Sequence, residues 1–182
     1  IIIKPKPEDP KTSELVVDKT AYAILRANNA SSNPVYDSVT TAINTGTILK
    51  ENDIVIFRME VTCKGDDPLG LEWIKDTLGD AYTFVEKTDS ITIENDAVRR
   101  ALKLPVTTWV GRTVTIQERV ENNTDTTVYE LYDWSSTNPH TMTWTAPGLR
   151  FTPCQKINFL LFAKVDGDPV SSGNYYNHVE LN

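Results

Sequence analysis

The stretch DIVIFRMEVTCKG, residues 53–65, decides the fold of this chain. Apolar side chains stand at every second position, at Val55, Phe57, Met59, Val61 and Cys63, and polar side chains stand between them. This period of two residues is typical of a strand with one buried and one solvated face. A Gly-Asp-Asp-Pro turn follows, and it leads into a second strand at Leu71–Lys75.

The stretch 143–165, TWTAPGLRFTPCQKINFLLFAKV, repeats this strand-turn-strand pattern. Its second half is apolar on both faces from Phe159 to Phe162, which predicts a central strand. Around these units the chain carries about ten short strands with turn signals every 8–12 residues. The sequence therefore predicts an all-β fold, an immunoglobulin-like β-sandwich of about ten strands. One short helix is expected at 95–104, inside an insertion, because Asp96 can cap it and Pro105 ends it.

The composition excludes several classes of function. The chain has 182 residues, 40% of them hydrophobic and 24% charged, and a net charge of −7. An acidic domain lacks the basic footprint that nucleic acid requires. No stretch approaches the roughly 18 apolar residues of a membrane span, so we expect no membrane insertion. The chain starts Ile1-Ile2-Ile3 without an initiator Met, from which we expect an exported product or an excised fragment, located outside the cell at its surface.

The first residues differ in character from the rest. Residues 1–12 are an extended arm, with the apolar triplet Ile1, Ile2 and Ile3 followed by prolines at positions 5, 7 and 10. Residues 13–182 form the sandwich domain. The arm is either a linker or a strand that docks on a sheet edge, its own or that of a neighbour. We expect docking, since free termini are ordered only where they are tied down.

Cysteine and histidine are scarce. Two cysteines, Cys63 and Cys154, are too isolated for a zinc site, and no His lies near either in sequence. Two buried thiols or one long-range disulfide remain equally open, and an exported setting favours the disulfide. The only histidines are His140 and His178, so a His-based triad or a multi-His metal site is poorly supplied. We predict no catalytic site, no metal site and no cofactor.

Four segments of the chain resemble the immunoglobulin-like repeats of bacterial and archaeal surface proteins, which are catalogued mostly as a domain of unknown function. These segments are residues 53–65, 74–85, 143–165 and the final YYNHVELN. The family pattern has a Gly-Asp before a long strand, an Asp-x-Leu-Pro turn followed by an aromatic, a Pro-Gly before a later strand, and an Asn opening the last strand. Asp76-Thr77-Leu78 with Phe84, then Pro153, then Asn177 are similar to the last three features. The resemblance covers roughly residues 14–182.

The chain departs from that pattern at three places. Gly79 stands where Pro is usual, Asn52-Asp53 replaces Gly-Asp, and Pro153-Cys154 replaces Pro-Gly. The insertion at 95–140 is also longer than usual. The resemblance implies an exported module that builds stalks or filaments rather than an enzyme.

A covalent cross-link is the sharpest chemical prediction. Lys19 is in phase with apolar residues of the first strand, and Asn177 is in phase with apolar residues of the last strand. Related pilin and adhesin domains join such a pair through an isopeptide bond, which requires a neutral, desolvated amine and a protonated acid. We nominate Asp76 as the acid and Glu72 as the second choice. In the simpler interpretation, Lys19 reaches the rim and Asn177 caps its strand.

Other features support alternatives. Asn29 and Asn122 open N-glycosylation triplets. Asp66, Asp67, Asp80 and the loop 166–168 could gather calcium at one pole, but none of them matches the full calcium-loop spacing, and ordinary Asp/Gly turns explain them better. Sugar binding is a further alternative, carried by exposed aromatic residues, of which the candidates are Trp109, Trp134, Trp144, Tyr132, Tyr175 and Tyr176.

These observations favour an extracellular structural module or a pilus-like filament subunit, which self-associates by strand addition of its arm or joins neighbouring domains of a surface protein. The alternative is a monomeric adhesin module that binds carbohydrate or protein. A secreted hydrolase is the least supported, because no carboxylate pair or nucleophile motif is singled out by its surroundings.

Overall fold

A computed structural model describes residues 12–28, 35–44, 46–85, 113–120, 123–130, 132–138, 140–166 and 177–181. These residues form strands and no helix. The strands are β1 (Glu14–Ala27), β2 (Tyr36–Thr40), β3 (Ile54–Lys64), β4 (Leu69–Leu78), β5 (Tyr82–Phe84), β6 (Thr113–Val120), β7 (Asn123–Glu130), β8 (Tyr132–Asn138), β9 (Thr141–Phe151), β10 (Lys156–Val165) and β11 (Asn177–Leu181).

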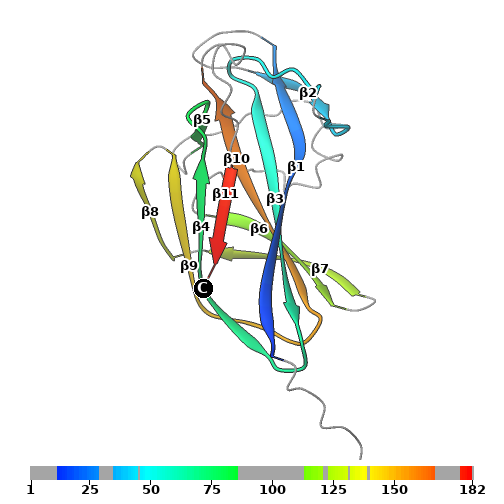
Figure 1. Ribbon diagram of the computed structural model, residues 1–182. Coiled ribbons are helices and arrows are strands. Elements are labelled where there is room, and N and C mark those ends of the chain that lie inside the picture. Colours follow the sequence, from blue (N-terminus) through cyan, green and yellow to red (C-terminus); the bar gives the residue numbers. More distant parts are fainter. Residues whose placement is uncertain are drawn as a thin grey trace, which may run out of the picture.

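The strands make two antiparallel sheets (Figure 1). One sheet has the order β2-β1-β3-β10-β6-β7, and β5 pairs with β10 beside that path. The other has the order β11-β4-β9-β8. Side chains of both sheets meet in one apolar core, which is the arrangement of a β-sandwich and confirms the predicted all-β class. The predicted helix at 95–104 lies outside the described residues.

The alternation in residues 53–65 is confirmed. All five residues from Val55 to Cys63 that were predicted to face inward are buried in the core, at 8% exposure or less. From the facing sheet, Leu71, Ile74 and Met142 meet them. Burying an aliphatic or aromatic side chain of this size stabilises a fold by roughly 1.5–3 kcal/mol, so this strand alone anchors the sandwich.

The first strand differs from what its sequence predicts. The pattern of residues 13–27 predicts a strand, a break and a second strand that includes Tyr22 and Ile24, whereas the structure has one strand of 14 residues with a bulge. The pairing with β3 shifts register between Ala21 and Ala23, so the side chains exchange faces there. Before the bulge Leu15 and Val17 pack on the core, and after it Ile24 does. The extra residue is the physical reason for the apparent break.

Strand β10 lies between β3 and β6, as its two apolar faces predicted. Leu161 faces the main core, and Phe162 faces the opposite side of the sheet. There it joins a second apolar cluster on the outer face of β1 and β3, whose other buried members are Ala23, Leu25, Tyr36, Ile54, Ile56 and Val85. This half of the sheet is therefore covered on both faces.

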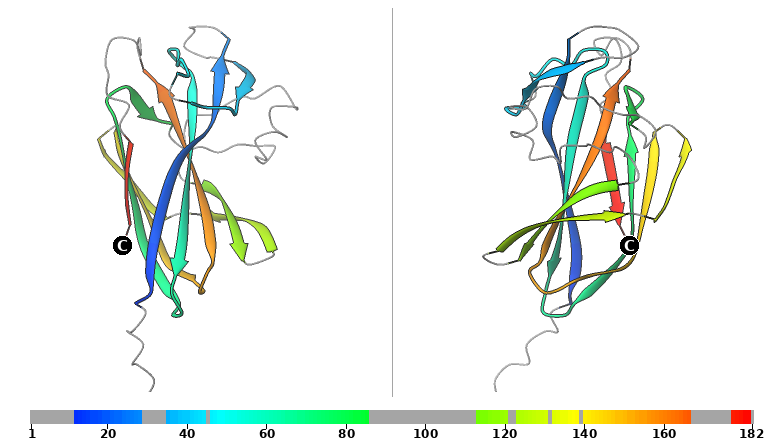
Figure 2. Two further views of the ribbon diagram at one scale, coloured as in Figure 1. Left: turned by 45° about the vertical axis from the view of Figure 1, so that its right-hand side comes forward. Right: turned by 180° about the vertical axis from the view of Figure 1, so that it is seen from behind.

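The alternation of Val114, Ile116 and Val120, followed by a polar turn at 121–126, predicts a hairpin, which the structure confirms with a shorter turn. Strands β6 and β7 pair from Val120 and Asn123 outward, so only two residues separate them. Strand β6 pairs with β10 only through Gln117–Arg119, and the hairpin then extends away from the sandwich (Figure 2). The sequence SSTNPH of residues 135–140 predicts a loop, but β8 continues to Asn138 because it pairs with β9.

Candidate functional site

Lys19 is a basic residue inside the sandwich. It lies in the middle of β1, where its backbone pairs with Met59 of β3. The phase of the strand before the bulge turns its side chain inward, and that side chain is only 8% exposed. Its Nζ lies 4.9 Å from the centre of the Phe57 ring, over the ring face. The aromatic face attracts the ammonium and also shields it from water.

Asp76 supplies the counter-charge from the other sheet. It lies in β4, where its backbone pairs with Met142 of β9 and with Val179 of β11. Its side chain is completely buried, and Lys19 Nζ donates a hydrogen bond to Asp76 Oδ2 within an ion pair. Because β1 and β4 belong to different sheets, this contact crosses the core of the sandwich. The structure thus brings together two of the three residues predicted for the cross-link.

Burial changes the chemistry of the amine. It lowers the pKa of Lys19 from 10.5 to about 8, mainly because the ammonium is desolvated, while the charge of Asp76 and its hydrogen bond act in the opposite direction. A lysine with a pKa near 8 is neutral far more often at physiological pH than an ordinary one. A neutral amine is the nucleophilic form.

The third predicted residue, Asn177, opens the last strand. Its backbone pairs with Leu78, two residues along β4 from Asp76. Strand β11 is the edge strand of its sheet, and β1 of the other sheet lies close to it. The Asn177 side chain lies outside the described part of the structure. Glu72, the second choice for the acid, is wrong, since it is exposed on β4 beside a register shift.

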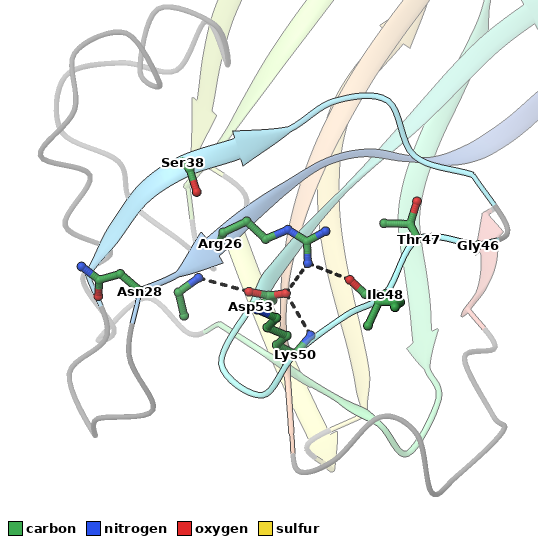
Figure 3. A pocket seen from close by; sticks show the side chains of 9 residues that line it. Arg26, Asn28, Ser38, Gly46, Thr47, Ile48, Lys50 and Asp53 are labelled. Atoms are coloured by element: carbon green, nitrogen blue, oxygen red, sulfur yellow. Dashed lines mark hydrogen bonds and ion pairs between the residues drawn. The ribbon is translucent and has the colours of Figure 1, made fainter.

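Asp53 holds a second buried ionic group, which the sequence analysis missed. Its carboxylate is fully buried and accepts hydrogen bonds from Arg26 Nη1 at 2.6 Å and from the backbone N–H groups of Ala27 and Lys50 at 3.1 and 2.9 Å (Figure 3). The same Arg26 nitrogen also donates to the Ile48 carbonyl oxygen at 2.8 Å. An Asp directly before a strand can accept hydrogen bonds from nearby backbone N–H groups. The position of Asp53 immediately before β3 was therefore the sequence signal that could have revealed this group.

The Arg26–Asp53 group lines an open hollow of about 630 Å³ beside β2. The carboxylate oxygens accept hydrogen bonds from the guanidinium and from two backbone N–H groups, so these partners all belong to the protein itself. Burial and the neighbouring Asp53 charge raise the pKa of the Tyr36 phenol to about 12, and its hydroxyl donates to the Asn52 carbonyl oxygen at 3.1 Å. The arrangement fastens the segment 46–53 to β1 rather than offering a ligand site.

The acidic turns of the described residues do not gather at one pole. Asp66 and Asp67 lie in the turn between β3 and β4, whereas Asp80 follows the far end of β4. A hydrogen bond from the Asp166 backbone N–H to the Ala81 carbonyl oxygen, 2.9 Å long, places Asp166 at that far end too. The length of β4 therefore separates the two groups. Among the residues that the structure describes, no cluster of three His, Cys, Asp or Glu side chains is suited to a metal ion.

The two cysteines are neighbours. Both are free thiols, Cys63 buried and Cys154 exposed, and the Cys154 backbone N–H donates to the Cys63 carbonyl oxygen at 3.0 Å. The pairing as a disulfide remains a prediction.

Several predicted residues lie outside the described part of the chain: Ile1, Ile2, Ile3, Asn29, Asn122, Trp109, Tyr175 and Tyr176. The same is true of the side chains of Tyr132, Trp134 and Trp144. The assembly arm, the glycosylation sites and the sugar-binding aromatics remain predictions.

The comparisons with protein families and with curated sequences give no relative. No protein-family model matches the chain, and no curated protein is significantly similar to it. Within the described ranges, no helix has the length and apolar character needed to cross a membrane.

Proposed function

We propose that this chain is an extracellular structural module, an immunoglobulin-like sandwich whose first and last strands are joined by an isopeptide bond. One observation carries the proposal: Lys19 and Asp76 meet in the core, across the two sheets, beside the strand that Asn177 opens. A buried ion pair contributes little net stability and is often replaceable by apolar residues, so stability alone explains it poorly. A desolvated amine beside an acid is the arrangement that isopeptide formation requires, so a chemical role explains the pair better.

Strand phase supports Asn177 as the acceptor. Val179 and Leu181, two and four residues further along β11, pack against the main core. Alternation along a strand predicts the same side for Asn177. Its side chain would then lie next to the Lys19–Asp76 ion pair.

The reaction balances within these three residues. A proton passes from the Lys19 ammonium to the Asp76 carboxylate, which leaves a neutral amine and a carboxylic acid. The acid donates a hydrogen bond to the Asn177 amide oxygen and makes Cγ more electrophilic. Nζ attacks Cγ, the Nζ–Cγ bond forms and the Cγ–Nδ2 bond breaks. Nδ2 leaves as ammonia after it takes up one proton, which Asp76 relays from Nζ.

The bond would serve a mechanical role. Tension applied through the two ends of the domain would pass directly from β1 to β11 through the covalent bond. The strands between them would carry no load and would not unfold. This behaviour suits a module that holds another part away from a cell or builds a filament.

An open strand edge supports assembly. Strand β2 pairs only with Ile24–Ala27, so the half of β1 before the bulge has no second neighbouring strand within the described residues. Such an edge presents backbone donors and acceptors that another strand can use. The arm of a second copy, Ile1–Ile3 first, is the occupant that we propose.

Mass spectrometry of the denatured, intact chain tests the cross-link. We expect the wild-type mass to be lower than the sequence mass by one ammonia, and Lys19→Arg, which keeps a cation but lacks the nucleophilic amine, to have its full mass. Tryptic digestion should yield one branched peptide that joins the segments around Lys19 and Asn177. A wild-type chain with the full sequence mass would overturn the proposal.

A further inference from the structure

The fold brings together the only two cysteines of the chain. They are separated by most of the domain in sequence, and the chain contains no other Cys. In the structure Cys154 donates its backbone N–H to the Cys63 carbonyl oxygen, and Cys63 donates its N–H to the Gln155 carbonyl oxygen, both at 3.0 Å. The direct backbone bond makes the two cysteines neighbours, and a disulfide requires such closeness because it joins residues whose Cα atoms are roughly 4.4–6.8 Å apart.

Cys154 occupies a position that suits glycine. The two hydrogen bonds place Cys154 and Gln155 opposite the single residue Cys63, which is a bulge at the start of β10. Cys154 has a φ of 64°, in the left-handed region. Bulges of this kind normally carry Gly at that point, because in this backbone conformation a Cβ is crowded against the neighbouring carbonyl oxygen. The Cys154 side chain is exposed, so packing does not compensate for this crowding.

The surrounding turn is fixed. Thr152 donates its backbone N–H at 2.8 Å and its hydroxyl at 3.1 Å to Gln155 Oε1, and the Gln155 N–H returns to the Thr152 carbonyl oxygen at 3.0 Å. Cys154 is therefore held beside Cys63 by backbone and side-chain bonds on both sides. Chance placement of a strained, exposed cysteine next to the only other cysteine is a poor explanation.

We propose that Cys63 and Cys154 are a redox-formed disulfide that closes the pole of the sandwich between β3 and β10. This inference is independent of the isopeptide bond. The chemistry needs an external low-molecular-weight disulfide, such as oxidised glutathione. The exposed Cys154 thiolate attacks one of its sulfurs and releases one thiolate. The Cys63 thiolate then attacks Sγ of Cys154 in the mixed disulfide, the Cys63–Cys154 bond forms, and the second external thiolate leaves.

The roles of the two thiols follow from their exposure. Cys154 can meet an external disulfide, whereas Cys63 is buried with its Sγ 3.6 Å from the Asp67 carbonyl oxygen. Closure requires the Cys154 side chain to turn from solvent toward β3. The bond would close a long chain loop, which restricts the unfolded state most strongly.

The test uses the full chain equilibrated with oxidised or reduced glutathione, followed by denaturation and thiol counting with a maleimide. After denaturation, oxidised wild type should be a single chain without free thiols and without intermolecular disulfides. Its melting temperature should exceed that of the reduced form by about 10 °C, given the usual effect of a disulfide that closes a long loop.

Cys154→Gly is the matched control, because Gly fits the positive φ. In reducing buffer it should be at least as stable as wild type, and in oxidising buffer it should be clearly less stable than wild type. Wild type that keeps two thiols, stops at the mixed disulfide on Cys154, or forms disulfide-linked dimers would overturn the proposal. The ammonia loss that reports the isopeptide is insensitive to glutathione, so the two proposals fail separately.

Discussion

Lys19 illustrates what a single charge requires inside a sandwich. Its ammonium lies over Phe57 and against Asp76, with little access to water. Either charge alone would be strongly disfavoured there, since desolvation of an unpaired ion costs several kcal/mol. The two residues are therefore coupled, and their substitutions should not be additive.

This coupling is measurable where no cross-link forms, in an Asn177→Ala background. There Lys19→Met should lower the free energy of unfolding by about 3–5 kcal/mol, because it leaves the Asp76 charge buried without its counter-ion. The double change Lys19→Met with Asp76→Leu should restore most of the loss. Urea unfolding gives both values. Lys75→Met is the control, since its ion pair with Glu180 is exposed and 3.5 Å long, and such pairs contribute less than about 1 kcal/mol. Additive losses at Lys19 and Asp76 would contradict the coupling.

The same lysine predicts a pH dependence. Its pKa is about 8 in the folded chain and 10.5 in the unfolded chain, so between these values the unfolded state binds more protons. The free energy of unfolding should consequently rise as the pH increases from 8 toward 10. Urea midpoints of the Asn177→Ala chain, compared with the same chain carrying Lys19→Met, isolate this rise. The comparison stops at pH 10 because the raised pKa of Tyr36 lowers the free energy of unfolding above that pH. Equal slopes in the two chains would refute the lowered pKa.

At the scale of elements, two local devices set the geometry. The bulge at Tyr22 changes the phase of β1, so that one strand contributes Leu15 and Val17 to the main core but Ala23 and Leu25 to the outer cluster. The buried Asp53 then fastens the end of this strand to the segment that precedes β3.

Removal of the Asp53 carboxylate should loosen that segment. Asp53→Ala leaves the Arg26 guanidinium and the N–H groups of Ala27 and Lys50 without their acceptor, so we expect a loss of about 3 kcal/mol. Hydrogen exchange at the two backbone amides should accelerate. Asp66→Ala, at an exposed carboxylate, should change neither quantity. Unchanged exchange at Ala27 and Lys50 would show that the carboxylate does not hold the segment.

The turn after β3 offers a second test. Gly65 has a φ of 99°, and a Cβ there would lie 2.7 Å from the Ser13 Cα, so Gly65→Ala forces β1 and the turn apart. Gly148 has a φ of 83° but no atom within 4 Å of the same position. Gly148→Ala should cost only the conformational strain of about 1–2 kcal/mol, and Gly65→Ala should cost clearly more. Thermal unfolding of the two variants compares them, and equal losses would argue against the close approach of Ser13.

At the scale of the whole molecule, covalent closure and assembly are the remaining questions. The proposed isopeptide joins β1 to β11, and the proposed disulfide joins β3 to the turn before β10. Together they would tie both strands of the β1–β3 pair to distant parts of the chain. The unpaired half of the β1 edge, within the described residues, remains open for another chain.

Light scattering with and without residues 1–10 tests assembly. The full chain should form multimers whose size grows with concentration, and the truncated chain should be monomeric, because strand addition by the arm supplies the contact. Circular dichroism and melting of the truncated chain control for its folding. If both chains are monomers of equal stability, the arm is a linker. Retention on a polysaccharide would then favour the adhesin alternative.

The sequence by itself determined the all-β class, the inward face of β3 and the central place of β10, because alternating or continuous apolar residues report burial locally. It also singled out Lys19, since a charge in an apolar phase is visible from spacing alone, and Asp76 was nominated as its acid without such a spacing argument. Only the tertiary structure decided which charges meet. The Lys19–Asp76 contact, the Arg26–Asp53 group and the approach of Cys154 to Cys63 all join distant segments. Such contacts depend on strand order and on the bulges at Tyr22 and Cys154. A one-residue shift of register reverses which face a side chain occupies, and local sequence does not specify where that shift occurs.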